Sequence, residues 1–507
     1  MKPDQLWGYA QRACDRTPDA VALVVANRTF NYRELQEGAR SVSASVQGSA
    51  GRGPFVGLFA YRSFGAYAGV LGILRAGKAY VPLDPHQPTE RLARIAALAE
   101  LDVIIADEPH AAAAIQLGRE LPVPPKVVVI GTPGADPGPL PEGCVPATDA
   151  SSETPVVGDH AYMLFTSGST GVPKGVPIRH RNVIAYVEHL HERFAPTAED
   201  RFSQTFELTF DLSVHDLFLC WSAGAALHVI PREELMAPAR FIREHALTQW
   251  FSVPSTAMLM ERMRQLKPGA FPSLRISAFC GEPLPAELAV KWAQATPNGR
   301  VVNLYGPTEA TIAIAEYDLD PARPKSRHGI LSIGQVFPGS SCAVLDADGH
   351  EANIGELLLG GPQVTDGYWR NAERTEAAFV TRGDQTYYRT GDIVERDADG
   401  DLFFVARTDD QVKVRGHRIE LQEVAHALKA ASGAAFAYPL AHPVREGIAL
   451  GIEAFLPEAH REEKEMILAR CAEMLPEYMV PTRLHFIDEV PFTTSGKVDM
   501  KALRARL

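Results

Sequence analysis

Short apolar runs alternate with longer segments of helical periodicity over most of the chain. Four of these runs are predicted to be buried strands: Val21–Val25, Val56–Ala60, Val103–Asp107 and Lys126–Ile130. Between them, segments such as Thr89–Glu100 repeat apolar residues at the spacing of one helix face. Strands that alternate with helices are typical of an α/β fold with largely parallel sheets.

The pattern changes near Ala406, after which the segments are shorter and more charged. Two amphipathic stretches there, Glu423–Ala431 and Glu463–Leu475, are predicted to be helices. A chain of 507 residues is also too long for one core. We therefore expect the α/β class: a large N-terminal multi-sheet domain, residues 1–406, and a small mobile C-terminal α+β domain, residues 407–507.

The composition of the chain argues against two classes of partner, nucleic acids and membranes. With 50 basic and 62 acidic residues the net charge is −12, which argues against a nucleic-acid ligand. The most apolar early stretch, Phe64–Leu83, contains Arg75 and Lys78, so no membrane span is expected. The six cysteines include no CxxC pair, and no secretory signal is visible. We expect a cytoplasmic monomer with no membrane association.

The segment Tyr162–Gly175, YMLFTSGSTGVPKG, carries the clearest chemistry. Glycines let backbone N–H groups converge on phosphate oxygens, while hydroxyl groups and Lys174 add donors and charge. The segment lacks the GxxxxGK[ST] spacing, because Gly175 follows Lys174. Composition alone would also fit a flexible surface loop.

The whole string resembles the phosphate loop of the adenylate-forming superfamily, which contains acyl-CoA synthetases, luciferases and the adenylation domains of nonribosomal peptide synthetases. Further motifs resemble that superfamily in the same order: Leu74–Pro85, Asn303–Ile312, Gly355–Trp369, Tyr388–Asp392, Ala406–Val424 and Thr493–Leu503. Among its members, the chain most resembles stand-alone amino-acid adenylation enzymes, such as D-alanyl carrier protein ligases and free-standing prolyl-adenylating enzymes.

This resemblance implies an ATP site with an Mg²⁺ ion. The residues implied to bind ATP are Thr166, Ser167, Gly168, Ser169, Thr170, Lys174, Tyr305, Asp392 and Arg407. Tyr305 would stack on adenine, and Asp392 would accept hydrogen bonds from both ribose hydroxyls. Thr308 would contact phosphate, and Glu309 would bind the metal through a hard carboxylate oxygen.

Two further residues are assigned to the moving domain by the same resemblance. Lys497 would be the catalytic lysine, neutralising charge on the α-phosphate and the substrate carboxylate, together with Thr308 and Glu309. Asp409 would be the hinge about which the small domain turns. At Ala406 the superfamily usually has glycine, which leaves the assignment unchanged.

The segment Phe206–Phe218, FELTFDLSVHDLF, indicates the substrate. By resemblance Asp211 would pair with the α-ammonium of an amino acid, which a fatty or aryl acid lacks. The remaining pocket positions carried over by motif are Leu212, His215, Ser252, Ala278, Cys280, Leu304, Ile312 and Ala313. Only His215 among them could carry a charge, so we expect a small neutral amino acid of alanine, proline or serine type, with chirality open.

The acceptor is expected to be a separate carrier protein, because the sequence ends at Leu507 with no carrier domain after Lys497. Arg415, His417 and Arg418 are candidates for contacting an acidic carrier, although as part of their motif they could equally serve only the fold. Two alternatives remain: an acid–CoA ligase that uses free coenzyme A, disfavoured by Asp211, and a catalytically silent nucleotide-binding or scaffolding subunit. The presence of the candidate ATP residues together with Lys497 argues against a catalytically silent subunit.

Overall fold

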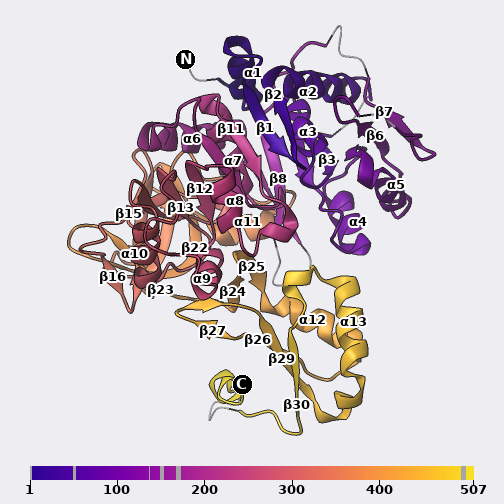
Figure 1. Ribbon diagram of the computed structural model, residues 1–507. Helices are drawn as coiled ribbons and strands as arrows, with labels where there is room; N and C mark the ends of the chain where they lie inside the picture. Colours follow the sequence, from indigo (N-terminus) through magenta and orange to yellow (C-terminus); the bar gives the residue numbers. More distant parts are fainter. Residues whose placement is uncertain (1–2, 50–52, 136–137, 149–152, 167–172, 493–497) are drawn as a thin grey trace.

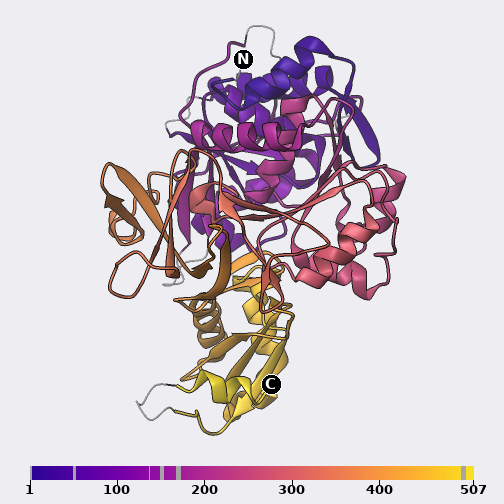
Figure 2. The ribbon, with the colours of Figure 1, turned by 90° about the vertical axis from the view of Figure 1, so that its left-hand side faces the viewer.

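The computed structural model describes residues 3–49, 53–135, 138–148, 153–166, 173–492 and 498–507 (Figure 1). It contains a large N-terminal domain and a smaller C-terminal one, which lies below the large domain in Figures 1 and 2. Among the described residues, four sheets form the large domain, one of them only the short pair β16 (Ser326–Arg327) and β17 (Ile330–Leu331), and two sheets form the small domain. The predicted multi-sheet α/β architecture is confirmed.

The largest sheet has nine strands, most of them parallel. In spatial order they are β18 (Gln335–Val336), β15 (Ala315–Asp318), β14 (Arg300–Tyr305), β13 (Ile276–Phe279), β12 (Gln249–Ser252), β10 (Arg201–Gln204), β11 (Ala226–Val229), β1 (Val21–Val25) and β2 (Arg28–Asn31). Strands β10, β12, β13 and β14 run parallel, so their carboxyl ends meet at one edge. In open α/β sheets ligands bind at that edge.

The second sheet has seven strands and is parallel except for its last pair. In spatial order they are β7 (Cys144–Pro146), β6 (Lys126–Ile130), β5 (Val103–Asp107), β3 (Phe55–Phe59), β4 (Ala79–Pro82), β8 (His160–Thr166) and β9 (Lys174–Arg179). Strands β8 and β9 pair in an antiparallel register that matches Thr166 with Lys174.

Helices cover these two sheets and form the main core with them. In the large domain they are α1 (Trp7–Arg16), α2 (Tyr32–Gln47), α3 (Phe64–Arg75), α4 (Thr89–Leu98), α5 (Ala111–Arg119), α6 (His180–Phe194), α7 (Leu212–Ala223), α8 (Ala239–Glu244), α9 (Pro254–Arg262), α10 (Ala286–Ala295) and α11 (Ala372–Ala378). Helix α3 is buried along its whole length, as expected of a helix that is apolar on every face. A Cβ at Gly72 would lie 2.5 Å from the carbonyl oxygen of Ala39, so the glycine permits the close approach of α2 and α3.

The third sheet is antiparallel and leads into the small domain. Its strands are β19 (Ser341–Leu345), β20 (Ile354–Gly360), β21 (Phe379–Arg382), β22 (Gln385–Arg396) and β23 (Leu402–Arg407). Strand β23 still pairs with β22 at Arg407, and the next strand, β24, starts at Gln411 in another sheet. The chain therefore passes between domains at residues 408–410, just after the boundary expected from sequence.

The small domain combines two short sheets with helices. Its elements are β24 (Gln411–Val414), β25 (His417–Glu420), α12 (Leu421–Ser432), β26 (Tyr438–Ala441), β27 (Val444–Arg445), β28 (Ile448–Ala449), β29 (Ile452–Pro457), α13 (Lys464–Met474), β30 (Arg483–Ile487) and α14 (Met500–Arg504). The hairpin β24–β25 lies at the junction with the large domain (Figure 1). Among the described residues, no helix is long and apolar enough to cross a membrane.

Candidate active site

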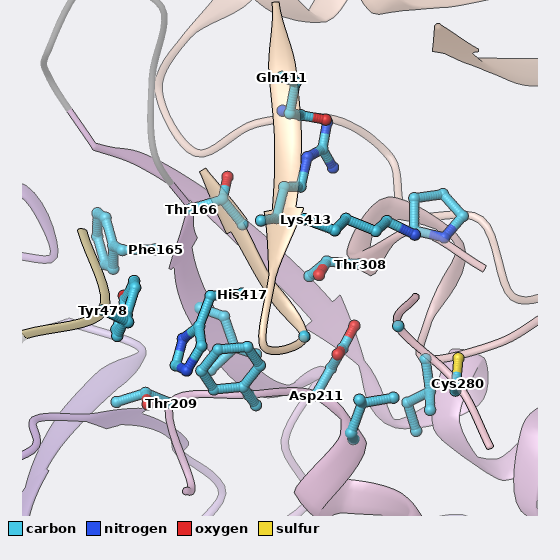
Figure 3. A pocket seen from close by; sticks show the side chains of 18 of the residues that line it. Phe165, Thr166, Thr209, Asp211, Cys280, Thr308, Gln411, Lys413, His417 and Tyr478 are labelled. Atoms are coloured by element: carbon cyan, nitrogen blue, oxygen red, sulfur yellow. The ribbon is translucent and has the colours of Figure 1, made fainter. Parts of the chain in front are cut away.

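A pocket forms where loops from the parallel strands meet the hairpin of the small domain (Figure 3). The segments after β10, β13 and β14 bring Asp211, Cys280 and Thr308 into its wall. Gln411 and Lys413 enter from β24, and His417 lies beside Tyr478. The site is therefore built from both domains.

Asp211 is a buried carboxylate next to the pocket, and it immediately precedes α7. Burial raises its pKa to about 6, although hydrogen bonds from the Thr308 hydroxyl and the backbone N–H groups of Leu212 and Ile312 oppose that rise. No cation contact with Asp211 is recorded among the described residues. A carboxylate held this way is suited to a ligand that brings a positive charge.

Glu309 is the second buried carboxylate, and it is surrounded by donors. Its Oε2 accepts a hydrogen bond from Arg418 Nη1 at 2.7 Å, and its Oε1 accepts one from the Tyr368 hydroxyl at 2.8 Å. Lys174 Nζ lies 3.6 Å from Oε1. Burial alone would raise the pKa of Glu309, but the charges of Arg418 and Lys174 and the Tyr368 hydrogen bond bring it to about 2.

A third cluster joins the end of β14 to Arg407 and Asp409. Asp392 Oδ2 accepts a hydrogen bond from the Tyr305 hydroxyl at 2.5 Å, and Asp392 Oδ1 accepts one from Arg407 Nη1 at 2.5 Å. Arg407 also donates to both oxygens of Asp409, at 2.7 and 2.8 Å. Each oxygen of Asp392 keeps a second lone pair for a further donor. Lys413 Nζ lies 5.8 Å from the centre of the Tyr305 ring.

The residues predicted to bind ATP are distributed around these clusters. Thr166, Asp392 and Arg407 line the pocket described above, and Tyr305 lines a neighbouring pocket that also includes Asp392 and Arg407. Ser167, Gly168, Ser169, Thr170 and the predicted catalytic Lys497 lie outside the described residues.

The predicted amino-acid positions do not all line the same pocket. Asp211, Leu212, Cys280 and Ile312 line the pocket together with Thr308. Leu304 lines the neighbouring pocket, and Ser252 lines a third pocket that shares Phe210, Gly416 and His417 with the first. His215, Ala278 and Ala313 are buried but line none of these three pockets.

His215 has a structural partner. Its Nδ1 lies 2.7 Å from the Tyr186 hydroxyl, and its ring lies 4.1 Å from that of Phe251 between centroids. Burial lowers the pKa of His215 to about 3, so the imidazole is neutral. Of the predicted substrate positions, only Asp211 therefore carries a charge.

Sequence reasoning missed two side chains that hold Glu309. Tyr368 lies within the motif Gly355–Trp369, where no role was assigned to it. Arg418, a candidate for carrier contact or for a role in the fold alone, faces inward onto Glu309 in this structure. His417 is likewise turned inward, with its ring 3.5 Å from that of Tyr478 between centroids. The usable signal was that a buried carboxylate requires a nearby cation.

The arrangement of sheets and domains is that of a solved adenylation domain. The crystal structure of the Vibrio cholerae adenylation domain AlmE in complex with glycyl-adenosine-5'-phosphate covers 100% of this chain and 98% of its own, with a TM-score of 0.89 and 30% identity. The chain belongs to the AMP-binding enzyme family, whose model matches residues 10–369.

Two relatives are similar over nearly their full length. The D-alanine–D-alanyl carrier protein ligase of Lacticaseibacillus rhamnosus is 33% identical over 98% of both chains. The L-proline–[L-prolyl-carrier protein] ligase of Pseudomonas fluorescens is 32% identical over 96% of both chains.

Proposed function

We propose that this chain activates a small neutral amino acid as its aminoacyl-adenylate, with ATP and Mg²⁺, and loads it onto the phosphopantetheine thiol of a separate carrier protein. The observation that carries the proposal is the buried carboxylate of Asp211 in the pocket wall, beside Thr308. Such a carboxylate favours a ligand with an ammonium group over a simple acid. The relatives named as amino acid–carrier protein ligases support the same reaction.

In the first half-reaction, the amino-acid carboxylate attacks the α-phosphorus of ATP and the bond to the pyrophosphate oxygen breaks. Asp211 orients the substrate through its ammonium, while Tyr305, Asp392 and Arg407 bind the nucleoside. Lys174 and the residues 166–170 hold the departing phosphates. Glu309 would hold an Mg²⁺ ion there, because it is a hard oxygen donor whose low pKa keeps it ionised, and the ion would neutralise phosphate charge.

In the second half-reaction, the carrier thiol attacks the adenylate carbonyl carbon, the bond to the phosphate oxygen breaks, and AMP leaves. The small domain, which follows residues 408–410, turns about Asp409 between the two halves. The pocket lined by Ser252 adjoins the first through Phe210, Gly416 and His417, which suits an approach path for the thiol.

The residues that line the pocket support a substrate amino acid with a small, neutral side chain. Leu212, Cys280 and Ile312 are apolar, and burial raises the pKa of the Cys280 thiol to about 12, which keeps it uncharged. A charged substrate side chain would have no partner among these residues. The alanine, proline or serine type remains the proposal, as do a cytoplasmic location and a monomeric state.

Pyrophosphate exchange tests the proposal directly. Each proteinogenic amino acid, and D-alanine, is assayed with the purified chain. A single small neutral amino acid is expected to dominate. Exchange with none of them, or faster exchange with a simple carboxylic acid, would contradict amino-acid activation. A thiolation assay then compares carrier proteins with free coenzyme A as the acceptor. Faster transfer to coenzyme A would favour the CoA-ligase alternative.

Lys497→Ala should separate the two half-reactions. Loss of its ammonium removes charge stabilisation from the α-phosphate, so amino-acid-dependent pyrophosphate exchange should fall by about 100-fold or more. Transfer from preformed aminoacyl-adenylate to the carrier should stay near the wild-type rate. An equal loss in both assays would argue against this division of roles.

The ionisation of Asp211 predicts how kcat/KM for the amino acid depends on pH. Its pKa of about 6 in the free protein is raised, so the carboxylate is protonated below that pH and its attraction for an ammonium is lost. We expect kcat/KM for the amino acid to fall about tenfold per pH unit below pH 6. In Asp211→Asn this break should be absent, which a pH series of pyrophosphate exchange on both proteins would show.

A further inference from the structure

Glu309 is buried completely, and both of its carboxylate oxygens are occupied. Oε1 faces the Tyr368 hydroxyl at 2.8 Å and Lys174 Nζ at 3.6 Å. Oε2 faces Arg418 Nη1 at 2.7 Å. The other end of the Arg418 guanidinium, Nη2, donates to the Tyr388 hydroxyl at 3.4 Å. No metal can reach Oε2 without approaching the guanidinium.

The partners of Glu309 differ in where they are anchored. Its own backbone carbonyl accepts a hydrogen bond from Thr365 N at 2.9 Å, which fixes it to the large domain. Lys174 and Tyr368 also belong to the large domain, in β9 and in the segment before α11. Arg418 alone among these three donors comes from the small domain, in β25.

The hairpin that carries Arg418 is held on the large domain in this arrangement. At its turn, Gly416 N donates to Glu282 Oε1 at 2.8 Å. A Cβ at Gly416 would lie 2.4 Å from Cγ1 of Val253, and φ is +80°, so the turn fits closely because it is glycine. A second ion pair, between Arg91 and Glu423, also bridges the domains and is largely buried.

We propose that Arg418 and a divalent cation occupy Glu309 in alternation, so that arrival of the metal releases the β24–β25 hairpin and departure of the metal allows it to return. The inference rests on the proposed role of Glu309 as the metal residue. A fully buried carboxylate is costly without a cation, but Glu309 already faces Lys174 and Arg418, and a divalent ion would add its charge to theirs. Because Lys174 is anchored in β9 of the large domain, Arg418 of the small domain is the cation that gives way to the metal.

The alternation of Arg418 and the metal at Glu309 couples the position of the small domain to the stage of the reaction. While metal and phosphates are bound, Arg418 is displaced and the small domain is free to present its other face. Once they leave, Arg418 compensates the charge of Glu309 and holds the hairpin in the pocket for thiol transfer. By linkage, the hairpin contact must weaken metal binding by the same factor by which metal weakens the contact. Arg418 is thus a positioning residue.

Hydrogen–deuterium exchange of the peptide covering residues 411–420 tests the coupling, because the Gly416 amide is protected only while the turn contacts Glu282. The non-reactive analogue α,β-methylene-ATP is present throughout, and only Mg²⁺ is varied from an EDTA baseline. Arg418→Met removes the charge, Arg418→Lys keeps it, and Glu423→Gln removes the interdomain ion pair with Arg91 without touching Glu309.

In the wild type and in Arg418→Lys, deuterium uptake by this peptide should rise with Mg²⁺. Glu423→Gln should start from higher uptake and still respond to Mg²⁺. Arg418→Met should start high, lose the Mg²⁺ response, and bind Mg²⁺ about tenfold more tightly.

Two results would overturn the alternation. One is an Arg418→Met response to Mg²⁺ equal to that of the wild type; the other is loss of the response in Glu423→Gln as well. Failure of the proposed function looks different: pyrophosphate exchange would then be insensitive to Mg²⁺ and to Glu309→Gln. If pyrophosphate exchange requires Mg²⁺ and Glu309 but deuterium uptake by residues 411–420 of the wild type does not change with Mg²⁺, the alternation is overturned and the proposed function stands.

Discussion

Replacing Asp211 with asparagine should lower kcat/KM for the preferred amino acid by about 100- to 1,000-fold, the cost of removing one partner of a buried charge pair. The amide keeps the shape of the side chain but presents no negative charge to the ammonium. Pyrophosphate exchange measures the loss. The same assay with the corresponding deaminated acid should change little, so the preference for the amine should collapse.

Stability measurements separate this effect from misfolding. The pKa of Asp211 is raised in the folded protein, so ionising it opposes folding, and that cost is present above about pH 6. Asp211→Asn removes the cost, and its thermal midpoint at neutral pH should equal or exceed that of the wild type. A lower midpoint together with lost activity would instead point to a structural role for the carboxylate.

Much of the fold could be predicted from the apolar pattern. Strands β1, β5 and β6 match the predicted runs residue for residue, and β3 is displaced by one position. Buried strands of parallel sheets are continuous apolar runs, so their limits are visible in sequence. Helix α4 begins at the predicted Thr89 and ends two residues before the predicted Glu100.

Less of the site could be predicted from the sequence, because its contacts join residues far apart in the chain. Asp211 could be singled out locally as a charge within apolar neighbours. The pairing of Glu309 with Arg418 spans 109 residues and two domains, so no local pattern encodes it. His215 shows the same limit: its hydrogen bond to Tyr186 comes from the packing of α6 against α7.

Glu309→Gln should lower pyrophosphate exchange by about 100- to 1,000-fold at a fixed low Mg²⁺ concentration, since a neutral amide is a poor ligand for a hard cation and no longer offsets its neighbours. Lys174 and Arg418 would be left facing each other across an uncharged side chain. Raising Mg²⁺ should restore part of the rate, and a Mg²⁺ titration of exchange would show this as a shifted midpoint.

Tyr368→Phe is the matched control, because it deletes the hydroxyl that donates to Glu309 Oε1 and accepts from Lys174 Nζ, and leaves every charge in place. A hydrogen bond to an ionised carboxylate contributes roughly 1.5–3 kcal/mol, so exchange should fall by about 10- to 100-fold, with a smaller shift of the Mg²⁺ midpoint than Glu309→Gln gives. A loss as large as that of Glu309→Gln would mean that carboxylate orientation, and not its charge, governs the step. Full activity of Glu309→Gln at low Mg²⁺ would remove this residue from the metal site.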